Sequence, residues 1–356
     1  MEVMIQELGE IITGNTPSKK VDEFWNSKDI YFIKPDSISD YGIDEISGSN
    51  DYISEYARKK ARVVGKNSIF VTCIGSIGKI GITLEGEYAF NQQINAIVPS
   101  NKVNIRYLAY NLLFNKSRLV NIANAPVVPI INKSQFGEFT VNIDTNVNRQ
   151  NEIVNVLDKL SHTIGLRMEE LSVLDDLIRA RFVEMFGDPI RNTQNRPTTE
   201  FINVVKMQRG FDLPVQERQQ DGDIPVYGSN GALDHHSVAK IYGGGVITGR
   251  SGTIGKVFYT EGEYWPLNTS LFSVDTHGNN VIYLAYLLQM FDLKRFVEGT
   301  GVPTLNRNMF HNKQIIEVAI DEQEKFADFV HQINKSKLTI NQKPIFHTPQ
   351  STDNML

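Results

Sequence analysis

Residues 75–79, GSIGK, recur as GTIGK at 252–256, and this repetition decides how the rest of the chain is interpreted. Three more pairs of similar segments follow in the same order: 85–88 with 261–264, 107–110 with 283–286, and 129–133 with 303–307. Their separation changes only from 177 residues (252 − 75) to 174 (303 − 129). Four ordered matches at nearly one spacing predict a duplicated domain. Two similar domains in one chain can face a partner with two-fold symmetry.

The composition is that of a globular protein that works inside a reducing cytoplasm. The 356 residues allow two domains of about 150 residues each. No stretch approaches the roughly 18–20 apolar residues that span a bilayer, and residues 1–4 lack a signal-peptide pattern, so we expect no membrane contact. The single cysteine, Cys73, excludes an internal disulfide and is expected in the core. The net charge of −5 disfavours a large basic nucleic-acid surface but allows local basic patches.

Both copies are expected to be α+β units built from short antiparallel strands. In the first copy we expect strands at 30–34, 68–74, 78–84 and 94–98, and a helix at 105–120. In the second copy we expect strands at 224–227 and 246–248, and a helix at 281–296.

A long helix is predicted at 147–186, where proline is absent and Gly165 is the only glycine. Its apolar residues follow a heptad-like seam: Ile153, Leu157, Leu160, Ile164, Leu171, Leu174 and Ile178. Such a seam needs a partner helix, and the candidate is 321–342, with Phe326, Phe329 and Ile333. This candidate begins at an equivalent place, since residues 150–153 align with 322–325.

These patterns divide the chain into five parts. The first copy occupies 1–146 and the second 188–320. The long spacer helix occupies 147–187, and a shorter distal helix occupies 321–343. The polar tail at 344–356 is expected to be disordered.

The motifs of catalysis and metal binding are missing from the sequence. Each Gly-Lys pair is followed by Ile80 or Val257 instead of Ser or Thr, which argues against a nucleotide-binding loop. The His235-His236 pair lacks further ligands at metal spacing. An Asn-Pro-Pro-aromatic sequence, which an amino-methyltransferase needs, does not occur. We therefore expect no catalytic residues and no metal site.

The repeated segments carry groups that suit nucleic acid. A glycine turn exposes backbone N–H groups, a hydroxyl and a cation to phosphates or base edges, arginine can pair with guanine, and asparagine or glutamine with adenine. The candidate DNA-binding residues are Ser76, Lys79, Asn91, Gln92, Gln93 and Lys133 in the first copy, and Arg250, Ser251, Thr253, Lys256, Asn268, Thr269 and Arg307 in the second. A structural role in a turn or a helix cap would explain each of these residues individually. The recurrence of the whole set at matching places in both copies favours a role in DNA binding.

The chain resembles the specificity (S) subunit of bacterial type I restriction–modification enzymes across residues 1–342. The similar segments are 8–14 (LGEIITG), 16–18 (TPS), 70–79 (FVTCIGSIGK), and the long helix from 151–154 (NEIV) to its exit at 185–189 (MFGDP). The resemblance implies that each copy is a target recognition domain for one half of a split DNA sequence. It also implies that the two helices pack as an antiparallel coiled coil, which sets half-sites about one helical turn apart.

The resemblance further implies partners that perform the chemistry. Two methyltransferase (M) subunits would dock on the helices, and motor/nuclease (R) subunits would join them on double-stranded DNA. S-adenosylmethionine, ATP and Mg²⁺ would bind those subunits, and this chain would bind no cofactor. The distal helix is shorter than in the family pattern, which leaves open weaker docking of one M subunit or pairing with a second S chain.

Two other interpretations stay open at the level of sequence. One is a non-catalytic adaptor whose repeated domains bind proteins or glycans. The other is an enzyme that uses His235 or His236. Salt-dependent DNA binding would favour DNA recognition over the adaptor. Turnover of a substrate by the isolated chain would support the enzyme.

Overall fold

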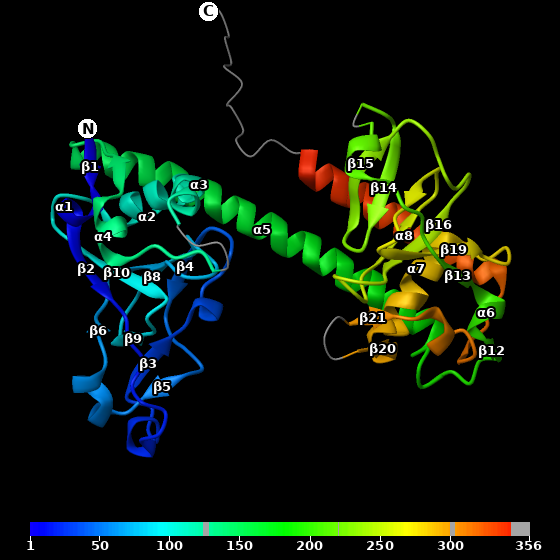
Figure 1. The fold of residues 1–356 in the computed structure, drawn as a ribbon, viewed down its shortest axis with the longest axis horizontal. Helices are drawn as coiled ribbons and strands as arrows, with labels where there is room; N and C mark the ends of the chain where they lie inside the picture. The colour runs from blue at the N-terminus through cyan, green and yellow to red at the C-terminus, as the bar shows by residue number, and fades with distance from the viewer. Residues whose placement is uncertain (124–127, 220, 300–302, 343–356) are drawn as a thin grey trace, which may run out of the picture. The chain divides into compact units, whose positions relative to one another are not determined.

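The computed structural model describes residues 1–123, 128–219, 221–299 and 303–342 (Figure 1). The chain forms two compact units, Met1–Gly165 and Leu166–Leu356. The boundary between them falls inside helix α5, Val147–Phe186, which is the predicted long helix. Across the described ranges, no helix is long and apolar enough to cross a membrane.

The first unit is built on two small sheets. The five-stranded sheet has the order β2 (Gly9–Thr13), β10 (Ile94–Pro99), β7 (Ile69–Thr72), β8 (Ile80–Thr83) and β4 (Ile43–Ile46). The four-stranded sheet has the order β5 (Tyr52–Ile53), β3 (Ile30–Ile33), β9 (Tyr88–Phe90) and β6 (Val63–Val64). Strand β1 (Glu2–Met4) pairs with β11 (Thr140–Asn142). The helices are α1 (Ile5–Leu8), α2 (Ile105–Phe114), α3 (Lys116–Asn121) and α4 (Lys133–Glu138).

The helix that the sequence predicts at 105–120 is divided at Asn115 into α2 and α3. The Asn115 side chain donates a hydrogen bond to the carbonyl of Asn111 at 2.8 Å and accepts one from Arg118 at 2.8 Å. An asparagine that binds neighbouring polar groups in this way competes with the regular helix, so the prediction of one continuous helix is wrong here.

The second unit repeats this architecture. Its main sheet has the order β13 (Lys206–Arg209), β19 (Ser270–Asp275), β16 (Gly245–Gly249) and β17 (Val257–Thr260). The smaller sheets are β15 (Gly231–His236), β14 (Ile224–Gly228) and β18 (Trp265–Pro266), then β12 (Thr198–Glu200) with β22 (Gln314–Ile316), and β20 (Val297–Glu298) with β21 (Thr304–Leu305). The helices are α6 (Phe201–Val204), α7 (Val281–Met290) and α8 (Ile320–Gln342).

The strand order confirms the predicted α+β duplication. The order β2-β10-β7-β8 in the first unit corresponds to β13-β19-β16-β17 in the second. The parallel pair β3–β9 corresponds to β14–β18, and the pair β1–β11 corresponds to β12–β22. The first unit adds β4, which lies parallel to β8.

A buried glutamine marks the same point in both units. Gln150 and Gln323, near the starts of α5 and α8, are 0% and 1% exposed. Gln150 accepts a hydrogen bond from the backbone N–H of Asn104 at 2.7 Å, and Gln323 accepts one from Asn280 at 2.9 Å. Asn104 caps α2 and Asn280 caps α7. The structural counterpart of Gln150 is therefore Gln323, and the sequence alignment that paired it with residue 322 is wrong by one position.

Helix α8 contacts the last turns of α5, as the seam predicts, and the two helices run antiparallel there, as the family resemblance implies. The Phe326 ring lies 5.5 Å from Phe182, while Lys337, further along α8, bonds Asp175 at 2.5 Å. Ile178 and Phe326 are fully buried. Phe329 and Ile333 also pack against this core.

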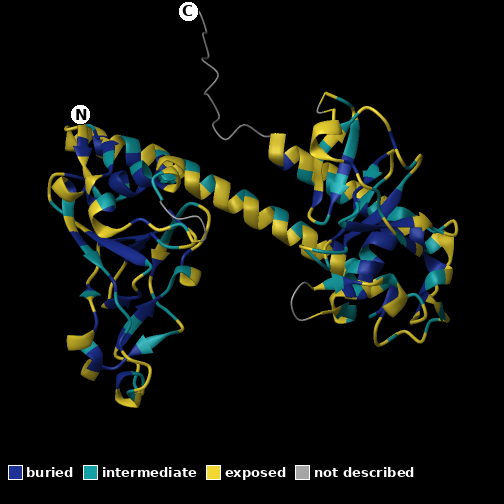
Figure 2. Cartoon of the chain, viewed as in Figure 1, coloured by how far each residue is buried: buried dark blue, intermediate teal, exposed yellow. Residues whose placement is uncertain are grey.

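The rest of the seam is more open to solvent (Figure 2). Ile153 and Leu157 pack partly buried within the first unit, while Ile164 is 41% exposed. Three further seam residues are half-buried: Leu160, Leu171 and Leu174. Most of α5 thus keeps apolar side chains accessible.

Candidate nucleic-acid interface

Three of the repeated segments meet at one place in the first unit. The backbone N–H of Cys73 donates to the carbonyl of Gln93 at 2.7 Å, and that of Ile131 donates to Cys73 at 2.9 Å. Gly75 at the turn donates to Pro129 at 3.0 Å. The glycine turn therefore lies between the polar segment 91–93 and the segment 129–133.

The second unit makes the same connections with the equivalent residues. The backbone N–H of Arg250 donates to Thr269 at 2.9 Å, and that of Leu305 donates to Arg250 at 2.8 Å. Ser251 forms a bridge with Thr304, as Ile74 does with Ile130. The segments that the sequence singled out thus converge twice in the same geometry.

The recurring glycines are required by the backbone of the turn. Gly75 and Gly78 have φ angles of 76° and 78°, and Gly252 and Gly255 have 79° and 86°. These left-handed conformations favour glycine strongly. The glycines are therefore explained by the turn, and any recognition rests with the side chains around it.

A lysine that the sequence analysis missed lies across the turn in each unit. A Cβ atom added at Gly78 would collide with the stem of Lys116, and one added at Gly255 would collide with the stem of Lys294. The two lysines occupy equivalent places after α2 and α7. Each turn therefore carries a second cation from a distant part of the chain.

In the first unit the turn lysines are bound internally. The Lys79 side chain is only 10% exposed, and its Nζ donates to the Ile38 carbonyl at 3.0 Å and lies 3.2 Å from the Asp40 carboxylate. Lys116 Nζ donates to the Asp40 carbonyl at 3.2 Å. The structure therefore does not present Lys79 as the open cation that the sequence predicts.

In the second unit the cations have neutral partners. Arg250 Nε donates to the carbonyl of Asn268 at 3.2 Å, and Lys256 Nζ donates to Asn230 Oδ1 at 2.9 Å. The side chain of Asn268 donates in turn to the Asp212 carboxylate.

The amide side chains among the predicted DNA-binding residues differ in their exposure to solvent and in their hydrogen-bond partners. Asn91 is 8% exposed and its Nδ2 donates to Gln93 at 2.8 Å, so this amide shapes its own turn. Gln92 is exposed, although Thr16 donates to it at 2.8 Å. Asn268 donates to Asp212. The remaining polar candidates are exposed or half-exposed: Ser76, Ser251, Thr253 and Thr269.

In the repeated pairs Asn132-Lys133 and Asn306-Arg307, the asparagine caps a helix and the second residue supplies a positive charge. Asn132 accepts a hydrogen bond from the Gln135 N–H at 2.9 Å and caps α4, and Asn306 accepts one from Asn308 at 3.1 Å. Capping explains why asparagine recurs. Lys133 is exposed and Arg307 is half-exposed, so both cations remain open to a ligand.

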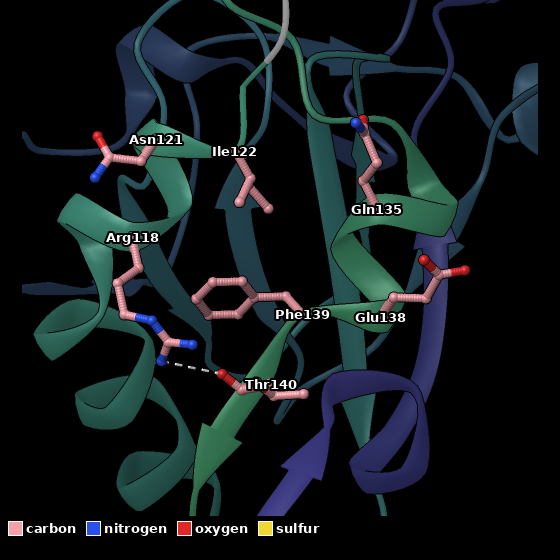
Figure 3. A pocket seen from close by; sticks show the side chains of 7 residues that line it. All are labelled: Arg118, Asn121, Ile122, Gln135, Glu138, Phe139 and Thr140. Carbon is pink, nitrogen blue, oxygen red and sulfur yellow. Dashed lines mark hydrogen bonds between the residues drawn. The ribbon is translucent and has the colours of Figure 1, made fainter.

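Cys73, the single cysteine of the chain, is buried in the first unit. Burial raises the pKa of the Cys73 thiol to about 12, which suits a core residue. An open pocket of about 670 Å³ beside α4 contains Arg118 above the Phe139 ring at 5.0 Å (Figure 3). Its seven lining residues include no histidine, cysteine or serine. Among the residues that the structure describes, no three metal-ligating side chains gather.

Comparison with known proteins gives one consistent family. The sequence model of the type I restriction modification DNA specificity domain matches residues 1–175 and 192–345. The type I restriction enzyme MjaIX specificity subunit of Methanocaldococcus jannaschii is 24% identical, over 99% of this chain and 90% of that protein. The EcoR124I/EcoR124II specificity subunit of Escherichia coli is 28% identical, over 48% of this chain and 46% of its own length.

A solved structure has the same fold. The type I restriction–modification S subunit from M. genitalium superposes with a TM-score of 0.55 at 15% identity, covering 96% of this chain and 91% of that one.

Proposed function

The chain belongs to the type I restriction–modification DNA specificity family, and from this membership we propose how its two units read DNA. It is a specificity subunit, a non-catalytic component that recognises DNA. Each unit reads one half of a split target through its glycine turn and the two segments beside it. The observation that carries the proposal is the paired set of backbone bonds that centres on Cys73 and on Arg250.

Within each unit, we assign different side chains to bases and to phosphates. Gln92 in the first unit and Arg250 in the second are placed at the turn with amide and guanidinium groups that can pair with base edges. The exposed cations Lys133, Lys256 and Lys294 suit phosphates, which position a protein on the duplex without reading its sequence.

Partner subunits complete the enzyme in this proposal. Two M subunits dock on α5 and α8, and R subunits join that core. S-adenosylmethionine, ATP and Mg²⁺ bind on those partners. In support, α5 leaves apolar side chains 41–60% exposed: Val156, Ile164, Leu166, Met168 and Val173. Basic surface on the partners would offset the net charge of −5 when DNA binds.

Footprinting of the assembled complex tests the proposal. DNA duplexes selected from a random library are probed in the presence of the M subunits. We expect protection of two short half-sites with a constant unread gap between them. A complex that binds every duplex equally contradicts the assignment, and so does one that protects a single continuous site.

A further inference from the structure

In the second unit, a hairpin turn outside the repeated segments lies against the glycine turn. It consists of Ser229 and Asn230, which join β14 to β15. A Cβ atom added at Gly249 would lie only 2.8 Å from the Ser229 carbonyl oxygen, and one added at Gly252 would lie 3.3 Å from Ser229 Oγ. Asn230 Oδ1 accepts the hydrogen bond from Lys256 Nζ at 2.9 Å. The hairpin turn therefore belongs to the same surface as the glycine turn.

The first unit fills the equivalent place with a different segment. The parallel pair β3–β9 corresponds to β14–β18, so the chain that follows β3 is the counterpart of the hairpin turn. Strand β14 continues into its hairpin partner β15, whereas β3 is followed by β4, which pairs with β8. The segment between β3 and β4 binds Lys79 through the Ile38 carbonyl and the Asp40 carboxylate.

The turn lysine thus has partners of different chemistry in the two units. In the first unit it contacts a carboxylate, and its side chain is only 10% exposed. In the second unit its partner is the amide of Asn230, and both residues of this pair lie at the surface: Asn230 is exposed and Lys256 is half-buried or more open. An amide beside a cation at the surface is suited to a nucleic-acid ligand.

The amide of Asn230 has the groups that recognise adenine. An asparagine that pairs with this base accepts a hydrogen bond from N6 and donates one to N7. The oxygen of an amide has two lone pairs, so the bond from Lys256 leaves one lone pair for the base. The same bond holds the side chain of Asn230 in place, which reduces the conformational freedom that is lost on binding.

We propose that Asn230 is a specificity-determining residue that reads an adenine in the half-site of the second unit. Lys256 orients its amide. The hairpin turn adds a fourth segment to the three that meet around Arg250, so the two units read their half-sites with different sets of side chains. The inference deepens the proposed function and rests on it, because it requires that the second unit binds DNA.

Competition binding of the assembled complex tests the proposal. The target duplex is substituted one base pair at a time, and the discrimination at each position is measured for wild type and Asn230→Ala. We expect the preference for adenine at one base pair to fall about 5- to 150-fold in the variant, with the other preferences kept. 7-Deazaadenine, which lacks the N7 acceptor, should weaken wild-type binding at that base pair and leave Asn230→Ala binding unchanged.

Asn230→Asp separates base reading from support of Lys256. An aspartate keeps the oxygen that binds Lys256 but cannot donate to N7. We expect both variants to lose the adenine preference. An Asn230→Asp complex that keeps it overturns the proposal, because Asn230 would then act only by holding Lys256. Unchanged preferences in Asn230→Ala, or equal weakening on every duplex, also overturn it.

Asn203→Ala is the matched control. Asn203 is another exposed asparagine of the second unit, but it lies in α6 and its Nδ2 donates to Thr199 Oγ1 at 3.0 Å. We expect this variant to keep the wild-type preference at every base pair. Loss of the same adenine preference in the control would contradict the assignment to Asn230.

These outcomes differ from a failure of the proposed function. A wild-type complex without any preference among duplexes refutes the proposed function. A wild-type complex that selects its target, with the same preferences in Asn230→Ala, refutes the role of Asn230 alone.

Discussion

Lys256→Ala is expected to reduce the salt dependence of DNA binding, whereas Lys79→Ala is not. The two lysines occupy the same place in the two copies of the turn. Lys256 is exposed and bonds only a neutral amide, while the Lys79 side chain is 10% exposed and faces Asp40. Only Lys256 is therefore free to neutralise a phosphate.

The magnitude follows from counterion release. Each phosphate contact contributes about 0.9 to the slope of log K against log salt concentration. Loss of one contact in Lys256→Ala lowers the slope by about 0.9. Between about 50 and 200 mM salt, wild-type binding would then weaken about 3.5-fold more than that of the variant. Lys79→Ala leaves the slope unchanged but lowers the melting temperature, because it removes the internal hydrogen bond of a nearly buried lysine to the Ile38 carbonyl and its contact with Asp40.

Fluorescence anisotropy of the assembled complex on its target duplex, measured over this salt range, gives the slopes. Equal reductions in the two variants would refute the reasoning, because they would mean that Lys79 leaves Asp40 to reach the DNA. An unchanged slope in Lys256→Ala would show that the second turn does not contact phosphate.

Four other changes test separate parts of the account. Arg250→Ala should relax the preference at one base pair by about 1–3 kcal/mol, measured on duplexes substituted at each position; an unchanged preference would remove Arg250 from base reading. Phe182→Ala should destabilise the second unit by about 3–5 kcal/mol in denaturant unfolding, since its ring is fully buried, and a smaller loss would mean that the core repacks. Leu160→Asp should weaken assembly with partner subunits on size-exclusion chromatography while the melting temperature of the chain stays near wild type. The hydrogen bonds from Arg196 hold the pKa of Glu322 below its usual 4.5, so this pair stabilises the fold above that pH and its contribution is lost as the pH falls through the lowered value. Thermal melts from pH 7 to 3 should thus be flatter for Glu322→Gln than for wild type, and identical curves would contradict the assignment.

The duplication and the long helix could be predicted because both depend on patterns within the sequence itself. The repeated segments keep one spacing, and α5 shows apolar periodicity without proline. Details that depend on single side chains could not be predicted. Asn115 interrupts a continuous apolar pattern through its own hydrogen bonds, and the role of Gln323 emerges only once Asn280 lies beside it.

The sequence indicated which segments form the candidate site. It did not indicate which of their side chains are exposed to solvent. The glycine turns depend on local sequence, so the sequence predicted them, and the structure contains both. The inward orientation of Lys79 depends on Ile38 and Asp40, which lie about 40 residues away in the sequence. Lys116 and Lys294 were missed because only the fold brings each lysine across its glycine, which lies 38 or 39 residues earlier in the sequence.

Methylation profiling of a host genome with and without this chain tests the central claim most directly, since it reports both half-sites and the gap between them. The account predicts a methylated motif of two short half-sites at a constant separation that disappears when the chain is deleted. A single continuous motif, or a motif that survives the deletion, would contradict it.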